Sequence, residues 1–366
     1  MRSVELFTGC GGLGLGLARA GFKHDLMVEW NGDAVETVLH NRAKKVEHIK
    51  HWPIVREDVR AIDWTPYYGV ALVAGGPPCQ PFSIGGKHKG NDDGRDMWPQ
   101  AIRAVRDIQP RGFIFENVRG LARPKFEPYL GAIVDGLRRA DPTGLGYHVA
   151  VQQVNAADYG AAQKRHRVII AGVRRDHAEG INPMVLTHSR ERLLWEQWVT
   201  GTYWAEHGIK RPKDGPERID EATVRRLIAI GAEPAEKRWV TVRDALRGLG
   251  EPDGAGNHVS QPGARIYVGH TGSPLDQPAK ALKAGDHGVP GGENMMVLDR
   301  GGVRYFSTRE AARLQGLPDD YEFPRSWTES MRQLGNAVPT QLAQAVGGWM
   351  HDMLNSARQK SQRLAA

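Results

Sequence analysis

The residue with the clearest chemical potential is Cys79, which lies in the segment Gly-Gly-Pro-Pro-Cys-Gln-Pro-Phe-Ser at positions 75–83. The prolines at 77, 78 and 81 supply no backbone donor and fix φ, so they favour a stiff, non-helical loop around the thiol. Such a loop suits a nucleophile that must approach a flat electrophile from one direction. A lone cysteine is more often a small buried apolar residue, but the sequence around Cys79 favours the chemical role.

Two other segments bring ionisable groups to the ends of predicted strands. Glu116 and Asn117 follow the apolar residues 113–115, and the run Gln-Lys-Arg-His-Arg at 163–167 precedes another apolar stretch. A glutamate at a strand end is usually a solvated cap, and a charge run is usually a solvated face. A carboxyl at such a position can donate a proton near neutral pH when burial raises its pKa. An arginine beside Cys79 would favour the reactive thiolate.

A glycine-rich turn near the N-terminus has the spacing of a nucleotide cradle. Gly9, Gly11 and Gly14 satisfy G-x-G-x-x-G between a predicted strand and a predicted helix. Glycines there permit a tight turn and the close approach of a ligand. Glu29 ends the next predicted strand, where a carboxylate can accept hydrogen bonds from ribose hydroxyls. These features alone would serve an NAD-dependent oxidoreductase equally well.

The elements that must position these residues alternate between strand-like and helix-like segments through the first half of the chain. This alternation predicts an α/β fold with a doubly wound, mostly parallel sheet, whose chemistry lies at the carboxyl ends of the strands. The clearest helix spans 96–108, because its apolar residues share one face and Pro110 ends it. The predicted strands are residues 4–7, 26–30, 71–74, 113–115 and 168–173.

The second half has a different texture. From about residue 174 to residue 302 glycine and proline are frequent, strands are hard to find, and tryptophans are interspersed with charge. Helices are predicted again over 308–314 and 340–354. We therefore expect a catalytic and cofactor-binding domain at 1–178, a smaller irregular domain at 179–303, and a return segment at 304–366 whose last helix packs back on the first domain.

The composition is that of an ordinary globular protein, with 40% hydrophobic and 25% charged residues. Lys and Arg exceed Asp and Glu by 49 − 42 = 7, which is compatible with a polyanionic partner but is weak evidence for one. No apolar run approaches membrane-spanning length and no signal peptide is recognisable, so we expect a cytoplasmic protein that binds no membrane. Cys10 and Cys79 are too few for a disulfide framework, and no Cys/His cluster has zinc-site spacing, so we expect no structural metal.

In combination, these motifs closely resemble those of the cytosine-5 DNA methyltransferases of the compact prokaryotic type. The Pro-Cys segment, Glu-Asn-Val at 116–118, Gln-x-Arg-x-Arg at 163–167 and two C-terminal segments at 308–318 and 333–339 occur in the family's order, from residue 4 to about residue 350. The resemblance implies a Rossmann-like methyltransferase fold and transfer of a methyl group from S-adenosyl-L-methionine to carbon 5 of cytosine. It implies that Cys79 adds to carbon 6 of the base while Glu116, with Asn117 beside it, assists at ring nitrogen 3. Arg165 would contact the base near the thiol, and Arg167 would brace the loop.

The same resemblance implies a cofactor site in the N-terminal part. Phe7 and Trp30 would pack around the adenine, and Asp58 would hydrogen-bond its exocyclic amine. Ala337 departs from the commonest pattern, which has a hydroxyl residue there, and we expect little consequence. The complete set of predicted cofactor-binding residues is Phe7, Gly9, Cys10, Gly11, Gly12, Leu13, Glu29, Trp30, Asp58, Val59, Pro78, Trp98, Asn336 and Ala337.

Residues 84–95 contain four glycines with basic residues among them. Such a stretch can be a plain surface loop, but its position beyond the Pro-Cys segment suggests a lid that closes over a cytosine taken out of the duplex. The predicted DNA-binding residues are Gln80, Ser83, Lys87, Lys89 and Arg95. Residues 179–303 would be the target-recognition domain and would contact base edges in the major groove. We expect a monomer whose partner is double-stranded DNA, with a cognate restriction endonuclease as its functional partner.

Three alternatives remain open from the sequence. A tRNA cytosine-5 methyltransferase would share every catalytic motif. A catalytically silent DNA-binding relative would lack the thiol or the acid, whereas this chain has both Cys79 and Glu116. An NAD-dependent oxidoreductase explains residues 9–14 and nothing after them.

Overall fold

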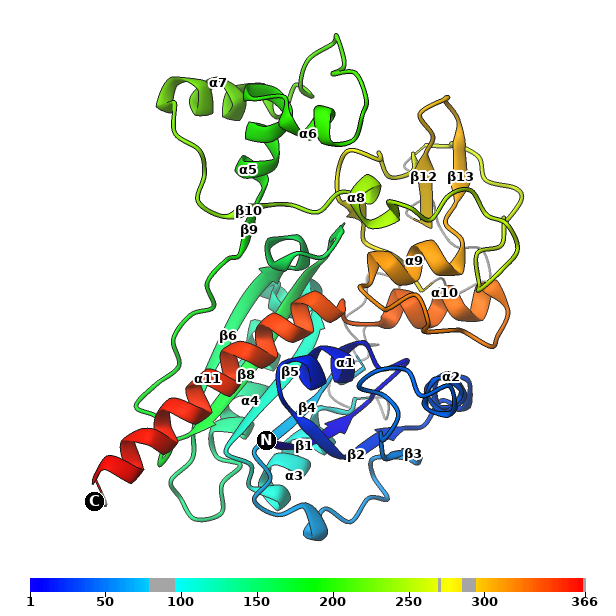
Figure 1. The fold of residues 1–366 in the computed structure, drawn as a ribbon. Helices are drawn as coiled ribbons and strands as arrows, with labels where there is room; N and C mark the ends of the chain where they lie inside the picture. Colours follow the sequence, from blue (N-terminus) through cyan, green and yellow to red (C-terminus); the bar gives the residue numbers. More distant parts are fainter. Residues whose placement is uncertain (79–95, 269–270, 285–293, 365–366) are drawn as a thin grey trace.

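The computed structural model of the chain describes residues 1–78, 96–268, 271–284 and 294–364. Its centre is a seven-stranded sheet with the strand order β3-β2-β1-β4-β5-β8-β6 (Figure 1). Neighbouring strands from β3 to β5 are parallel, and β8 runs antiparallel between β5 and β6. The predicted doubly wound, mostly parallel sheet is therefore confirmed. Its strands are β1 (Arg2–Leu6), β2 (Lys23–Glu29), β3 (Ile54–Arg56), β4 (Leu72–Gly75), β5 (Gly112–Val118), β6 (Tyr147–Asn155) and β8 (His166–Arg174).

Helices cover both faces of this sheet, which is why its central strands are nearly continuous apolar runs. On one face α3 (Trp98–Ile108) and α4 (Glu127–Arg138) pack against residues such as Phe113 and Phe115. On the other face α1 (Gly12–Arg19) and α11 (Thr340–Leu364) pack against residues such as Ile114. The remaining helix of this region, α2 (Gly32–Ala43), lies beside β2 and β3. The predicted helix at 96–108 begins at Trp98, whose N–H donates to the Asp96 carboxylate at 3.0 Å.

The close approach of α1 and α11 depends on glycine. A Cβ atom on Gly16 would lie 2.3 Å from the Cβ of Ala343 and 2.6 Å from the backbone nitrogen of Gln344. No larger residue fits there without moving a helix. Figure 1 shows the consequence, because α11, the last element of the chain, crosses the sheet beside α1.

The second half consists of short elements in two packed parts. The first part has its own core, built from residues such as Leu193, Trp198, Trp204 and Leu227. The second part shares one core with α1 and α2, in which Phe306 and Leu334 lie with Cys10 and Val38. The elements of the first part are β9 (His188–Ser189), α5 (Arg190–Leu194), a π-helical turn (Trp195–Val199), α6 (Thr202–Glu206), α7 (Glu221–Ile230) and β10 (Lys237–Arg238). Those of the second are α8 (Val242–Leu246), β11 (Ala279–Lys280), β12 (Met295–Val297), β13 (Val303–Tyr305), α9 (Thr308–Leu314) and α10 (Trp327–Asn336).

One further short strand joins the two halves. β7 (Gln163–Lys164) precedes β8 and pairs with β11. The proposed domain boundaries at 178/179 and 303/304 stay a prediction.

Within the described ranges, no helix is both long and apolar enough to cross a membrane. The 3-10 turns are Thr65–Tyr67, Arg119–Ala122, Pro124–Phe126 and Ala156–Tyr159.

Candidate active site

The carboxyl end of β5 carries Glu116 and Asn117 to the place where β4 ends and the Pro-Cys segment begins. Phe115 pairs with Gly75, the last residue of β4, so Glu116 lies beside Gly76. A Cβ atom on Gly76 would be 3.5 Å from Oε2 of Glu116. The Asn117 side chain donates from Nδ2 to the carbonyl oxygen of Pro77 at 3.0 Å. Both side chains are buried, so β5 holds a carboxylate and an amide against the residues that lead to Cys79.

Several predicted site residues lie outside the described residues, among them the proposed nucleophile. Pro78, which is exposed, is the last described residue before them. Their placement therefore stays a prediction. These residues are Cys79, Gln80, Ser83, Lys87, Lys89 and Arg95.

The two predicted arginines make contacts opposite to those expected. Arg167 forms an ion pair with Glu116, and both side chains are largely buried. Arg165 is 2% exposed and donates to the carbonyl oxygens of Leu282 at 3.0 Å and Gly335 at 2.7 Å. The expectation that Arg165 contacts the base while Arg167 braces the loop is therefore corrected. The reason is the β5–β8 register, which sets Arg167 against Val118 and next to Glu116, whereas Arg165 precedes β8 and lies under the return segment.

Glu29 organises the glycine-rich turn. Its Oε2 accepts the N–H of Gly9 at 2.8 Å and its Oε1 accepts the N–H of Asn31 at 2.7 Å. Burial raises the pKa of the Glu29 carboxyl, and these backbone donors act in the opposite direction. Phe7 has φ +58°, a left-handed conformation that costs a residue other than glycine about 1–3 kcal/mol. The surrounding contacts thus impose the shape of this turn.

The start of α1 offers unused backbone donors. The helix begins after Gly11, at φ +83°, and no side chain caps it, so its first N–H groups are available to an anionic ligand. A Cβ atom on Gly9 would meet nothing within 4 Å, so the turn is open on that side. On the other side Ala337 and Val338 approach Gly12, whose Cβ would lie 2.4 Å from the carbonyl oxygen of Val338.

One aromatic residue, Trp30, and one acidic residue, Asp58, are the next predicted contacts of the cofactor. Trp30 is 72% exposed, so it is no core residue, and its face is available to stack on a flat ring. Asp58 is engaged by the Arg60 side chain, whose Nε donates to both carboxylate oxygens at 3.0 and 2.9 Å. These hydrogen bonds lower the pKa of the Asp58 carboxyl. An amine bound by Asp58 must share the carboxylate with Arg60.

Other predicted cofactor residues have buried side chains. Cys10 is 1% exposed, its thiol lies 3.7 Å from the carbonyl oxygen of Gln333, and burial raises its pKa to about 12. Leu13 and Val59 belong to the core. Trp98 packs edge-on against Phe115, and its buried Nε1 has no hydrogen-bond partner among the described residues. Cys10, Leu13 and Val59 can therefore meet a ligand through their backbone alone.

Buried polar residues that the sequence reasoning missed hold this region together. The Asn155 side chain accepts the N–H of Arg165 at 3.0 Å, and Gln163 donates to the carbonyl oxygen of Leu314 at 3.1 Å. Gln163 and Arg165 are buried, whereas Lys164 and His166 are exposed. This period of two in a charged run is the signal that could have revealed which side chains face inward.

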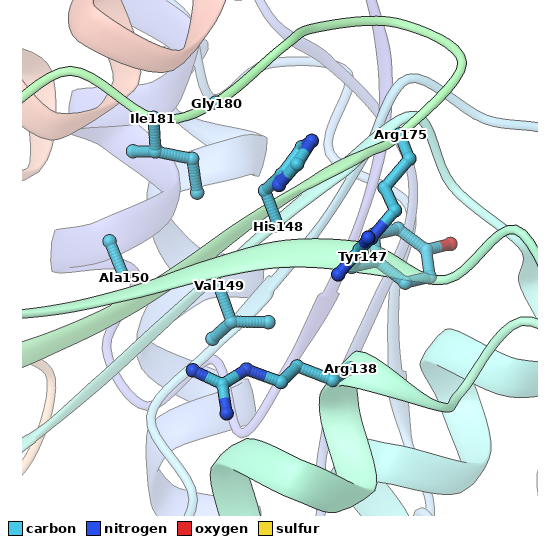
Figure 2. A pocket seen from close by; sticks show the side chains of 8 residues that line it. All are labelled: Arg138, Tyr147, His148, Val149, Ala150, Arg175, Gly180 and Ile181. Carbon is cyan, nitrogen blue, oxygen red and sulfur yellow. The ribbon is translucent and has the colours of Figure 1, made fainter.

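A basic depression of about 310 Å³ lies away from this site, at the start of β6 (Figure 2). Tyr147 pairs with Arg174 at the end of β8, seven residues beyond Arg167, a distance of about 23 Å along the strand. The depression therefore belongs to the opposite edge of the sheet. Its lining residues are Arg138, Tyr147, His148, Val149, Ala150, Arg175, Gly180 and Ile181.

Metal ligands are not gathered anywhere in the part of the chain that the structure describes, because it contains no group of three or more His, Cys, Asp or Glu residues that could hold an ion. The described polar side chains at the carboxyl edge of β5 are the carboxylate of Glu116, the guanidinium of Arg167 and the amide of Asn117.

The sheet order, the glycine-rich turn and the acidic residue at the end of β2 define the class of Rossmann-like methyltransferases. A solved structure described as a DNA modification methyltransferase encoded within an Escherichia coli prophage superposes with a TM-score of 0.61 at 22% identity, covering 97% of this chain and 99% of that chain. This likeness concerns the fold.

Residues 1–351 match the family of C-5 cytosine-specific DNA methylases, and the chain belongs to that family. The Type II methyltransferase M.NgoMIV of Neisseria gonorrhoeae is 31% identical over 360 residues, which cover 94% of this chain and 95% of that protein. The Type II methyltransferase M.PspPI of Psychrobacter sp. is 32% identical over 360 residues, covering 97% and 80%. The protein is thus a DNA cytosine methyltransferase, and the NAD-dependent oxidoreductase is excluded.

Proposed function

We propose that the protein methylates carbon 5 of a flipped-out cytosine in a specific duplex sequence through a covalent adduct with Cys79. The observation that carries this mechanism is the Glu116–Arg167 pair, buried at the end of β5 beside Gly76 and Pro77. A carbon nucleophile is needed at position 5 of the ring, and addition of a thiolate to carbon 6 creates one.

The roles of the chain's own residues follow from this chemistry. The Cys79 thiolate forms a bond to carbon 6, and Glu116 assists at ring nitrogen 3, where negative charge would otherwise accumulate. Arg167 orients Glu116, and since a guanidinium has five N–H donors, those not used by the carboxylate can contact the carbonyl oxygen of the base. After carbon 5 is methylated, water removes the carbon 5 proton and the carbon 6–sulfur bond breaks.

The methyl donor is S-adenosyl-L-methionine, which supplies an electrophilic methyl group when bound. The cradle fits it in three ways: the Glu29 carboxylate can accept hydrogen bonds from ribose hydroxyls, the exposed Trp30 can stack on the adenine, and the open start of α1 can donate N–H groups to the carboxylate. Asn336, which is exposed, and Ala337 would line the methionine end beside Gly12.

The biological setting is proposed from the relatives. Both are Type II methyltransferases by name, so we place this protein in a restriction-modification system, acting as a cytoplasmic monomer on double-stranded DNA. Residues 179–303 would read the target sequence.

Replacement of the thiol tests the mechanism. Cys79→Ala should abolish methyl transfer to DNA while S-adenosyl-L-methionine still binds, measured by transfer of a tritiated methyl group and by calorimetry. DNA containing 5-fluorocytosine should trap the wild-type protein in a denaturant-resistant adduct, because fluorine cannot leave as a proton does. Turnover by Cys79→Ala above background, or the absence of an adduct, would exclude the covalent route.

A further inference from the structure

Two lysines from opposite halves of the chain lie side by side at the catalytic edge. β7 and β11 are parallel neighbours, with Lys164 in register with Lys280. The N–H of Ala279 donates to the carbonyl oxygen of Ala162 at 2.8 Å, which fixes this register. Adjacent strands are about 4.8 Å apart, a spacing at which two lysine side chains can reach oxygens of one phosphate.

Neither ammonium group forms an ion pair with a carboxylate among the described residues. Lys280 Nζ donates to the neutral hydroxyl of Thr271 at 2.7 Å. Lys164 is exposed, and its side chain has no hydrogen bond or ion pair with a described residue. Desolvation lowers the pKa of Lys164, and repulsion from Arg190 and Lys280 lowers it further, against the opposing carboxylates of Glu217 and Asp220.

Like charges on neighbouring strand positions destabilise a sheet unless an anion lies between them. Of the two nearby carboxylates, Asp220 is already paired with Arg190, and Glu217, which makes the larger Coulombic contribution at Lys164, forms no ion pair with it. The lysine pair therefore has the electrostatic character of an anion site.

The position of the pair indicates which anion it meets. Lys164 and His166 share the exposed face of the run that leads to Arg167, while Arg165 faces inward. Arg119, three residues after Glu116, is also exposed, and it lowers the pKa of His166 in addition to desolvation. Lys280, Lys164 and Arg119 are thus the cationic side chains on this side of the Glu116–Arg167 pair, whereas His166, whose pKa is lowered by desolvation and by Arg119, is neutral near pH 7.

We infer that Lys164 and Lys280 together bind one backbone phosphate of the DNA strand that carries the target cytosine. This inference rests on the proposed function. A phosphate contact fixes the register of a protein on DNA without carrying sequence information. Lys164 belongs to the half of the chain that contains the proposed catalytic residues, and Lys280 belongs to the half that contains β11. A phosphate bound by both lysines would therefore also hold these two halves in a fixed relative position.

The test compares Lys164→Gln, Lys280→Gln and the double variant with wild type in binding to a mixed-sequence duplex at several salt concentrations. Each single variant should bind about tenfold more weakly, since a charged hydrogen bond is lost. The double variant should lower the salt slope by about one in total, because the two lysines share one phosphate. A fall of about two would mean separate phosphates, and an unchanged slope would mean no contact; either result overturns the inference.

The control is Lys23→Gln. Lys23 is exposed at the start of β2, on the edge of the sheet opposite to Glu116, and this variant should bind DNA as wild type does. Calorimetry with S-adenosyl-L-methionine should give the same affinity for all variants, which shows that they fold.

Methyl transfer separates this inference from the proposed function. The lysine variants should raise KM for DNA and retain kcat at saturating DNA. If wild type methylates cytosine and the lysine variants match it in KM and salt slope, only the phosphate site is wrong. If wild type forms no 5-methylcytosine in bisulfite sequencing, the proposed function itself fails.

Discussion

At the scale of single residues, Arg165 and Arg167 differ in the partners that they contact. Arg167 holds Glu116, whereas Arg165 ties β7 to Leu282 and Gly335 from inside the protein. The two residues have the same side chain and lie on the same face of one extended run. Their partners alone distinguish them: Arg167 is a candidate for contact with the base, and Arg165 stabilises the packing of the return segment.

Lysine substitutions distinguish these two roles. Arg167→Lys keeps the charge but loses the planar fork, so it should lower kcat for methyl transfer by about tenfold or more with little change in unfolding free energy. Arg165→Lys should reduce the unfolding free energy by about 2–4 kcal/mol, because buried carbonyl groups lose a donor that fits them. Urea unfolding and single-turnover methyl transfer measure both. If both variants lost kcat equally and neither lost unfolding free energy, the two arginines would not have the different roles inferred here.

Glu5 and His24 form a second buried pair beneath the glycine-rich turn, 4.0 Å apart. Burial raises the pKa of the Glu5 carboxyl well above its usual value and lowers the pKa of His24 to about 4. The ring nitrogens of His24 lie 3.0 Å from the Ser3 hydroxyl and 3.0 Å from the carbonyl oxygen of Gly14, which suits a neutral imidazole. We therefore describe the pair as neutral in the folded protein.

This neutral pair predicts a pH dependence of stability. Above about pH 4.5 the unfolded state has lost the Glu5 proton that the folded state retains, so Glu5 lowers stability progressively as the pH rises toward its folded pKa. The difference in unfolding free energy between Glu5→Gln and wild type should thus increase with pH by up to about 1.4 kcal/mol per unit. Urea titrations between pH 5 and 8 measure it. A difference that is constant or falls with pH would indicate an ionised pair.

Much of the site could be predicted from residue types and spacing. The sequence placed Glu116 and Asn117 at the end of a buried strand, and it placed Glu29 at the end of the strand that follows the glycine-rich turn, because these positions follow from local patterns. The arginine partners could not be predicted in the same way, because Glu116, Leu282 and Gly335 are distant in the sequence and only the folded chain brings them to Arg167 and Arg165. The contact between Arg60 and Asp58 was also missed, because the side-chain conformation that brings these two residues together leaves no recognisable pattern in the sequence.

At the scale of elements, the strands and helices that were easiest to predict are buried on both faces or strongly amphipathic. Helix α9 has the predicted bounds, Thr308–Leu314, and its capping box of Ser307 and Glu310 explains why they were visible. β6 was missed because it is an edge strand with half-exposed residues. The antiparallel direction of β8 could not be predicted either, since pairing direction depends on the connection through β6.

The contact between α1 and α11 gives a prediction at this scale. Gly16→Ala places a Cβ atom 2.3 Å from that of Ala343, so it should reduce the unfolding free energy by about 1–3 kcal/mol or more and weaken cofactor binding. Gly131→Ala in α4 is the matched control: its Cβ meets nothing within 4 Å, and it should stabilise the helix by about 0.5–1 kcal/mol. Thermal unfolding of both variants checks this. If the Gly16→Ala protein were as stable as the control, α1 and α11 could move apart to accommodate the added methyl group without loss of stability.

At the scale of the whole molecule, the two packed parts of the second half are attached differently. The part at 189–239 has its own core, and among the described residues of the first 178 only Ala157 belongs to it. The part that begins at Val242 shares its core with α1 and α2. Exchange of the first part should therefore disturb the cofactor cradle less than exchange of the second.

Sequence specificity should move with residues 179–303, because none of the catalytic motifs supplies a side chain that must reach neighbouring base pairs. Grafting this segment from a relative with a different target should give an enzyme that methylates the donor's target, mapped by bisulfite sequencing in methylation-free bacteria. Calorimetry with S-adenosyl-L-methionine identifies chimaeras that have folded. A folded, active chimaera that still methylates the original target would place specificity elsewhere in the chain.

The return of the chain at α11 also determines when the enzyme can first work. A ribosome releases the glycine-rich turn, the Pro-Cys segment and β5 long before it releases the helix that starts at Thr340. Until then Gly16 has no Ala343 to pack against, and Gly12 lacks the neighbouring Val338. A polypeptide abandoned before this helix is made therefore contains every proposed catalytic side chain and still lacks the residues that pack against Gly12 and Gly16.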